Sequence, residues 1–302
     1  MIMDEAAFEW KDEYNIGVEV IDNAHKQLFR IVSRIINNFS DIDFEKNKTT
    51  CIEAIKYLKN YTVKHFAEEE AYQIQINHPG FQVHKKIHDN MRNVVVPALE
   101  KEVVAKGYSK ESLEHFAGVC AGWLTAHILI EDRAITGKTH SKWVKSANDN
   151  KEDVLNDIIR GYSSSLFLMN AELLSKRFAG HKLNNIFCYN DVLEARNGTV
   201  YSVTTAIEYP MLEIIARRLV KQESLELDSV MLPMLSEMLK SFNMEVMMAF
   251  INEAPARKES KAIPEENFYA QYDKIYPDYS MLWRTYCGYL AFTSKKVNTE
   301  PQ

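Results

Sequence analysis

Residues 65–88 carry three histidines and a glutamate in two pairs whose members lie four residues apart. The pairs are His65 with Glu69 and His84 with His88. Residues four apart on a helix lie one turn apart on the same face, so each pair presents two metal-ligating side chains together. A single pair of this kind also occurs on solvated helix faces, whereas two pairs on consecutive helices rarely arise by chance. The spacing therefore predicts a metal site between two helices.

Two further segments each add one histidine. His25 lies in residues 21–39, where apolar residues form a helical stripe, and His127 lies inside the apolar run WLTAHILIED. A lone histidine on an apolar face is more often a core residue than a ligand, but these two accompany the pairs. Imidazole and carboxylate ligands together suit iron, and carboxylates can bridge two ions, although manganese and zinc accept the same ligand types.

The first half of the chain predicts four helices that would position these side chains. Apolar residues recur at helical spacing over residues 21–39, 44–72, 81–107 and 109–133. Residues 77–80 (NHPG) separate the second helix from the third, and Pro97 should kink or end a segment of the third. Ser109 can cap the fourth helix, and Gly137 can end it. The short breaks favour an all-α, up-down four-helix bundle.

The second half predicts a different fold class. Helical patterns over residues 153–178, 209–220 and 227–242 alternate with strand-like runs over 197–207, 244–251 and 286–294. This mixture predicts an α+β domain. Eight of the nine histidines precede residue 141, and residues 139–153 are polar. We therefore predict one domain over residues 1–140 and a second over residues 151–302, which would serve signalling or dimerisation.

Charge and cysteine usage narrow the class of protein. The 302 residues carry a formal net charge of −6, so the chain offers no basic field for nucleic acid or acidic membranes. The longest apolar stretch is about fifteen residues, too short for a membrane span, and we find no secretory signal. The four cysteines are far apart, which is typical of buried thiols in a reducing compartment. We expect a cytoplasmic protein.

Taken together, the motifs resemble the hemerythrin family, its bacterial branch in particular, over roughly residues 8–135. The matching segments are GVEVIDNAHKQLF, HFAEEE, HKKIH and WLTAHILIED. The resemblance implies two iron ions in an oxo- or hydroxo-bridged centre, with O2 as the ligand. All seven ligand positions of the family are occupied here, by His25, His65, Glu69, His84, His88, His127 and Asp132.

The same resemblance implies a role for each of these ligands. Two carboxylates, Glu69 and Asp132, would bridge the ions. One iron would be six-coordinate, and the other would keep one position open for O2. The histidines of the first iron would be His84, His88 and His127, and those of the second would be His25 and His65.

The bridging carboxylate at the end of the fourth helix poses a geometric question. Asp132 follows His127 by five residues, about 140° round an ideal helix, and Glu131 faces His127 better. The family pattern favours Asp132, which needs a distorted last turn, and Glu131 is the rival. Trp123 and Leu124 are either walls of the O2 pocket or ordinary core residues. The glutamates that flank Glu69 point away from it and should be solvated.

A segment of the second half, LDSVMLPMLSEMLKSFNMEVMMAF, faintly resembles the chemotaxis phosphatases of the CheC/CheX type. Those proteins use a glutamate and an asparagine one turn apart to act on an aspartyl phosphate. Here Glu237 is followed three residues later by Lys240, and Asn243 comes six residues later. This departure argues against phosphatase activity, and the leucines of the segment would then pack a core or a dimer interface.

These observations favour an oxygen or redox sensor, because O2 carriage needs only the bundle. Its partners would be O2 and, through the second domain, a signalling protein or a second copy. One alternative is an O2 storage or delivery protein. Others are a di-iron oxidase or peroxidase-type enzyme and an iron-regulated phosphatase of a chemotaxis-like pathway. A histidine-rich site favours O2 binding over turnover, since oxidising di-iron enzymes tend to be carboxylate-rich.

Overall fold

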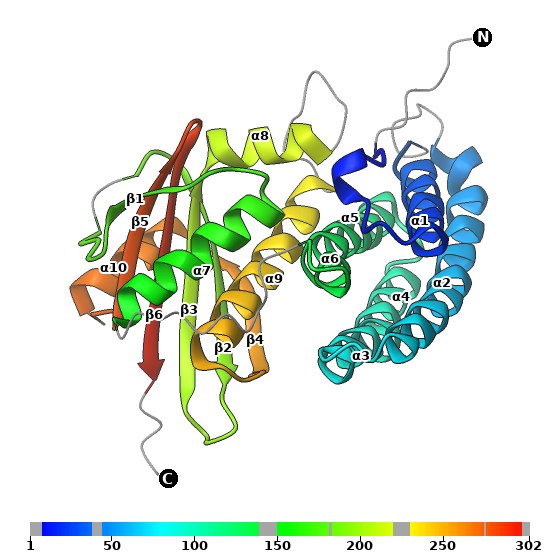
Figure 1. Ribbon diagram of the computed structural model, residues 1–302. Coiled ribbons are helices and arrows are strands. Elements are labelled where there is room, and N and C mark those ends of the chain that lie inside the picture. Colours follow the sequence, from blue (N-terminus) through cyan, green and yellow to red (C-terminus); the bar gives the residue numbers. More distant parts are fainter. Residues whose placement is uncertain are drawn as a thin grey trace. The chain divides into compact units, whose positions relative to one another are not determined.

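The computed structural model describes residues 8–37, 44–138, 150–180, 183–219, 230–274 and 276–297 (Figure 1). The chain forms two compact units. The first comprises Met1–Lys138 with Arg217–Met234, and the second comprises Thr139–Ala216 with Leu235–Gln302. The predicted boundary over residues 140–150 lies almost entirely outside the described residues.

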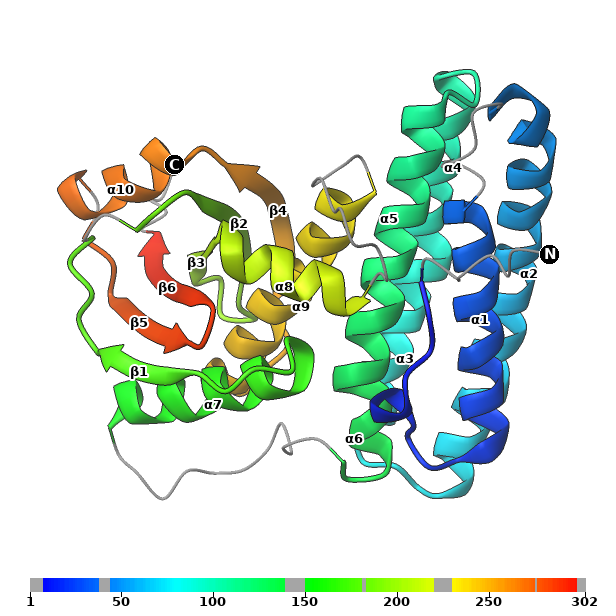
Figure 2. The same ribbon diagram turned by 90° about the horizontal axis from the view of Figure 1, so that it is seen from above.

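The first unit contains four helical rods that run side by side (Figure 2). Its all-α fold confirms the prediction from helical periodicity. A short 3-10 helix, η1, precedes the rods at Asp12–Tyr14. The third and fourth rods each contain a π-helical segment, a widened turn that often marks functional sites. The rods are α1 (Glu19–Asn37), α2 (Phe44–Gln75), α3–η2–α4 (Phe81–Asn90, Met91–Val95, Val96–Ala105) and α5–η3–α6 (Lys110–His127, Ile128–Asp132, Arg133–Ile135).

The residues that end and begin the rods act as the sequence predicts. Asn77 has a positive φ of 51° in the break after α2. Pro97 lies in the first turn of α4, just after the π-helical segment of the third rod. Ser109 caps α5 by accepting a hydrogen bond from the backbone nitrogen of Ser112 at 3.3 Å. Gly137, with a φ of 71°, follows the last helical turn.

The fourth rod is the most apolar and is largely buried. Residues Lys110–Ile135 are long and apolar enough to cross a membrane by length and composition, but 89% of their most apolar window is buried inside the protein. A helix that is apolar on all sides also arises when neighbouring helices cover it all round. The burial therefore explains the apolar composition of this rod as that of a core helix.

The second unit is built on a six-stranded antiparallel sheet in the order β1-β5-β6-β3-β2-β4. Together with its helices, this sheet confirms the predicted α+β fold. Strands β2 and β3 form a hairpin whose turn contains Gly198 at a φ of 81°. The strands are β1 (Glu172–Ser175), β2 (Ile186–Glu194), β3 (Val200–Glu208), β4 (Ala256–Ile263), β5 (Tyr279–Thr285) and β6 (Gly288–Val297).

Helices cover both faces of this sheet (Figure 1). On one face lie α7 (Lys151–Leu166) and α9 (Met231–Ile251), where the Tyr162 hydroxyl donates to Glu245 at 3.3 Å. On the other face lies α10 (Glu265–Lys274), whose Phe268 packs into a core with Cys188, Ala206 and Ala291. Helix α8 spans Tyr209–Leu219. Each face therefore has its own apolar layer.

Two element predictions in the second half are wrong. The helix predicted over residues 153–178 ends at Leu166, because Leu168 adopts a positive φ of 54° and the chain continues as β1. The run over residues 244–251 is not a strand but the last part of α9. A short apolar run fits a buried helix as well as a buried strand, and here the preceding helix continues through it.

Candidate metal centre

The seven predicted ligand residues meet in the interior of the bundle. We call them the histidine–carboxylate cluster, and none is more than 4% exposed. The five imidazoles direct their Nε2 atoms toward one another and toward the two carboxylates. Between rings, the Nε2 atoms lie 2.9 Å apart in His88 and His127 and 3.2 Å apart in His84 and His88. From Nε2 to a carboxylate oxygen, the distances are 3.2 Å from His25 to Asp132 Oδ2, 3.5 Å from His65 to Glu69 Oε2 and 2.8 Å from His84 to Glu69 Oε1.

Asp132 reaches the cluster because the fourth rod changes its winding. Residues Ile128–Asp132 form a π-helical turn, in which hydrogen bonds join residues five apart instead of four. Residues at that separation then share a face, which places Asp132 Oδ1 3.0 Å from His127 Nε2 and 3.3 Å from His84 Nε2. The distorted turn that the sequence required is present. Glu131 is also buried, at 7% exposure.

The cluster fits a pair of metal ions. Two overlapping sets of ligand atoms lie within 4.8 Å of one another, and they share Glu69. Among the described residues, several of these buried atoms have no hydrogen-bond partner, which is costly unless an ion takes that place. The first set comprises Glu69, His84, His88 and His127, and the second comprises His25, His65 and Glu69. The atoms without a hydrogen-bond partner include His25 Nε2, Glu69 Oε2 and both oxygens of Asp132.

Electrostatics prepares most of the cluster for metal binding. Burial, together with the neighbouring imidazoles, lowers the pKa of His88 and of His65, so both rings are neutral and free to coordinate. Burial opposes ionisation of Asp132, but His127 and His25 hold the pKa of this carboxyl well below its usual range. Burial also opposes the charge on His84, yet Glu69 and Asp132 raise its pKa to about 9. Metal binding must therefore displace the His84 proton.

A carboxylate outside the cluster, that of Glu70, orients the His88 ring. Glu70 was predicted to be solvated, and this prediction is wrong: its side chain is 13% exposed and its Oε1 lies 3.2 Å from His88 Nδ1. Arg92 also contacts Glu70, at 3.4 Å. A carboxylate behind a metal-binding histidine fixes the ring and its tautomer, and leaves Nε2 for the ion. Glu68, by contrast, is 46% exposed, as predicted.

Sequence reasoning missed one buried residue beside the cluster. Gln73 is fully buried on α2, and its Nε2 donates a hydrogen bond of 2.7 Å to Glu69 Oε1. Its spacing was an available signal, because it follows Glu69 by four residues and therefore shares its face. Two other histidines of the bundle lie outside the cluster: His115 contacts Glu102 at 3.0 Å, and His78 lies in the turn after α2.

Aromatic rings shield the cluster from water. Phe66 stacks on His88 with ring centroids 3.8 Å apart, and Trp123 stacks on His127 at 4.3 Å. Trp10 lies over His25 at 6.0 Å. Phe66 and Trp123 are buried. A water-excluding wall of this kind strengthens the electrostatic interactions inside it.

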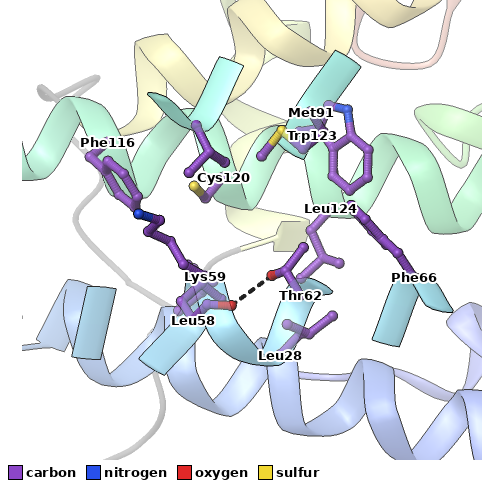
Figure 3. Close-up of a pocket in the computed structure, with 12 residues that line it drawn as sticks. Leu28, Leu58, Lys59, Thr62, Phe66, Met91, Phe116, Cys120, Trp123 and Leu124 are labelled. Carbon is purple, nitrogen blue, oxygen red and sulfur yellow. Dashed lines mark hydrogen bonds between the residues drawn. The ribbon is translucent and has the colours of Figure 1, made fainter. Parts of the chain in front are cut away.

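An apolar cavity adjoins the cluster inside the bundle (Figure 3). Its volume is about 30 Å³, enough for one molecule of the size of water. Leu28, Thr62 and Leu124 line it, each three residues from a cluster histidine. Phe66 and Trp123, whose rings stack on His88 and His127, also line it. The Thr62 hydroxyl donates a hydrogen bond to the backbone oxygen of Leu58 at 2.8 Å. Trp123 and Leu124 are buried core residues, and both line this cavity.

The residues considered for a phosphatase site in the second half are engaged with one another. Lys240 pairs with Glu237 at 2.9 Å on α9. The Asn243 side chain is fully buried, and its Nδ2 donates to Asp191 Oδ2 at 2.9 Å. Glu237 and Asn243, which would act together, are therefore each held by other side chains. Among the residues that the structure describes, both candidate metal-ligand sets lie in the bundle.

Comparison with known proteins identifies relatives of the bundle. The model of the hemerythrin HHE cation binding domain matches residues 16–138. A bacteriohemerythrin of Clostridium acetobutylicum is 30% identical over 127 residues, which are 42% of this chain and 96% of that protein. A bacteriohemerythrin of Pseudomonas aeruginosa is 27% identical over 143 residues, 47% of this chain and 88% of that protein. A myohemerythrin of Sipunculus nudus is 26% identical over 133 residues, 43% and 92% respectively.

Among solved structures, the second half is similar to chemotaxis proteins. The chemotaxis protein CheX from Vibrio vulnificus is 7% identical, with a TM-score of 0.37, and the alignment covers 51% of this chain and all of that one. A CheC-like superfamily protein from Shewanella is 10% identical, with a TM-score of 0.34 over 50% of this chain and 99% of that one. At these TM-scores the likeness carries no argument about the activity of the second half.

Proposed function

The chain belongs to the hemerythrin family through residues 16–138, and we propose that this half binds O2 at a di-iron centre held by the histidine–carboxylate cluster. The family binds such a centre and O2. The observation that carries the proposal is the convergence of five Nε2 atoms and two carboxylates in a buried volume. Several of these atoms have no other partner in the described chain.

In the proposed centre, each of the two sets of ligand atoms would hold one ion. His84, His88 and His127 would hold one iron, and His25 with His65 would hold the other. Glu69 belongs to both sets. Asp132 also reaches both sides, with one oxygen 3.2 Å from His25 Nε2 and the other 3.0 Å from His127 Nε2. The two-histidine side has fewer protein ligands, which leaves room there for O2.

The surrounding side chains favour binding of O2 over its consumption. The iron pair, when bound, supplies the electrons and the open coordination position that O2 binding needs. Phe66, Trp123 and Leu124 keep water and its protons from the cluster, which slows irreversible oxidation. The adjoining cavity can hold a molecule as small as O2 next to the rings. We propose that the first half does not turn over O2 as an enzyme.

Visible absorption tests this function directly. The iron-loaded protein, titrated from anaerobic to aerobic conditions, is expected to hold two irons per chain. A ligand-to-metal charge-transfer band should appear on adding O2 and disappear on removing it. Immediate conversion to a stable ferric form would instead favour an enzyme or an irreversible redox sensor. Protein that binds no metal pair would contradict the assignment of the cluster.

The second half is proposed to be an output domain, over residues 151–302, that makes the protein an oxygen or redox sensor in the cytoplasm. Carriage of O2 needs only the bundle, whereas this chain adds a complete α+β unit. Its partner would be a signalling protein or a second copy of the chain. Storage or delivery of O2 is the competing role. It predicts that the structure of the second half does not change when O2 binds to the iron.

Hydrogen exchange distinguishes sensing from carriage. In the full chain, amide exchange within residues 151–302 is expected to differ between the O2-free ferrous protein and the O2-bound protein, because a sensor must pass its state to the output domain. Exchange in the bundle provides the internal positive control. Identical exchange of residues 151–302 in both states, with no change in self-association, would favour the carrier.

A further inference from the structure

Gln73 is a neutral, fully buried amide that contacts an anionic member of the cluster. Its Nε2 donates to Glu69 Oε1 at 2.7 Å from one turn further along α2. A carboxylate oxygen can only accept, so the amide nitrogen must face it. We propose that Gln73 is a positioning residue that orients Glu69 and reduces its electron donation to the metal pair, an inference that rests on the proposed di-iron function.

The hydrogen bond acts on one side of the cluster only. Glu69 Oε1, which accepts it, lies 2.8 Å from His84 Nε2. The other oxygen, Oε2, lies 3.5 Å from His65 Nε2 and has no hydrogen-bond partner among the described residues. Gln73 therefore modifies the oxygen that faces the three-histidine set and leaves the oxygen nearer the two-histidine set unmodified.

A donor on an anionic ligand has a predictable electronic effect. The bond is charge-assisted, and it draws electron density from the carboxylate oxygen. A carboxylate that donates less stabilises ferric iron less, so the ferrous form, which binds O2, gains relative to the ferric form. Hydrogen bonds behind metal ligands tune affinity and potential in this way.

The other end of the amide argues against a purely structural role. Gln73 Oε1 is buried and has no donor among the described residues. An unpaired buried amide oxygen costs free energy, and an apolar side chain of the same size would avoid that cost. The contact with Glu69 is the interaction that offsets it.

The test compares three variants of the full-length, iron-loaded protein. Gln73→Met keeps the size of the side chain and removes the donor. Gln73→Leu also removes the donor, with a branched apolar side chain. Gln75→Met is the matched control, because Gln75 is exposed two residues further along the same helix. Iron content, the midpoint potential and thermal unfolding by circular dichroism are measured for each.

Both Gln73 variants are expected to bind the iron pair at a lower midpoint potential, with the ferric form favoured about tenfold more after Gln73→Met. Gln73→Leu should shift the potential in the same direction as Gln73→Met, and Gln75→Met should not shift it. A wild-type potential in Gln73→Met, or an equal shift in the control, would show that Gln73 only fills space. If Gln73→Met does not fold, Gln73→Leu decides by the same readout. A wild-type protein without paired iron overturns the function and this inference together.

Discussion

Asp132→Asn is expected to reduce bound iron from two ions per chain to one or none. The replacement keeps the shape of the side chain but removes a buried negative charge between the two ligand sets. Asp132 is fully buried and approaches His25, His84 and His127 within 3.0–3.3 Å. Without this charge, the positive charge of two ions in a buried site is less well compensated. Metal analysis after loading and desalting measures the result.

Glu131→Gln provides the matched control for this experiment. It removes the same charge from the adjacent residue, which is also buried but is not a member of the histidine–carboxylate cluster. Iron content is expected to stay at two ions per chain in this variant. If Glu131→Gln loses iron while Asp132→Asn keeps it, the rival carboxylate is the true bridge, and the π-helical turn has another purpose.

Local spacing predicted the positions in the cluster well, because two residues four apart on a helix share a face whatever surrounds them. His65, Glu69, His84 and His88 are of this kind. Asp132 followed from the family pattern and not from ideal geometry, since the widened turn that aligns it has no clear sequence signature. Glu70 was misjudged because its burial comes from the facing helix α3, a tertiary contact.

The sheet was harder to predict than the bundle for physical reasons that its strands show. Strand β2 carries Asn190 and Asp191 in its centre, residues that usually indicate turns, but here hydrogen bonds from neighbouring strands and α9 satisfy them. Strand β4 (ARKESKAI) is largely exposed and charged, as an edge strand often is, so it has no apolar alternation. Both strands are stabilised by contacts with other elements and lack the alternation of apolar and polar residues that would reveal a strand in the sequence.

Asp191→Ala is expected to lower the free energy of unfolding by about 3 kcal/mol. Asp191 is fully buried, and side chains from two elements, β4 and α9, converge on it. Its oxygens accept from Ser260 Oγ at 2.6 Å and from Asn243 Nδ2 at 2.9 Å, and they pair with Arg257 Nε at 2.9 Å. Removing the carboxylate takes one acceptor from the Arg257 guanidinium and one from the Asn243 amide, which keep only the backbone oxygens of Lys240 and Tyr189. Because Arg257 keeps access to water, the cost should lie at the low end for a broken buried pair. Urea unfolding of the iron-free protein, followed by circular dichroism, measures it.

Asp157→Ala is the control, since it removes an equal charge from an exposed position on α7 and should change the free energy of unfolding by less than about 0.5 kcal/mol.

The comparison of the two variants tests the role of the polar network around Asp191, which consists of its contacts with Ser260, Asn243 and Arg257. A large loss confined to Asp191→Ala means that the network joins β2, β4 and α9 into one body, which an output domain needs if it is to respond as a unit. If Asp191→Ala is as stable as the control, the buried carboxylate is retained for another reason. Asp191 and Asn243 would then be the first residues to examine for partner binding.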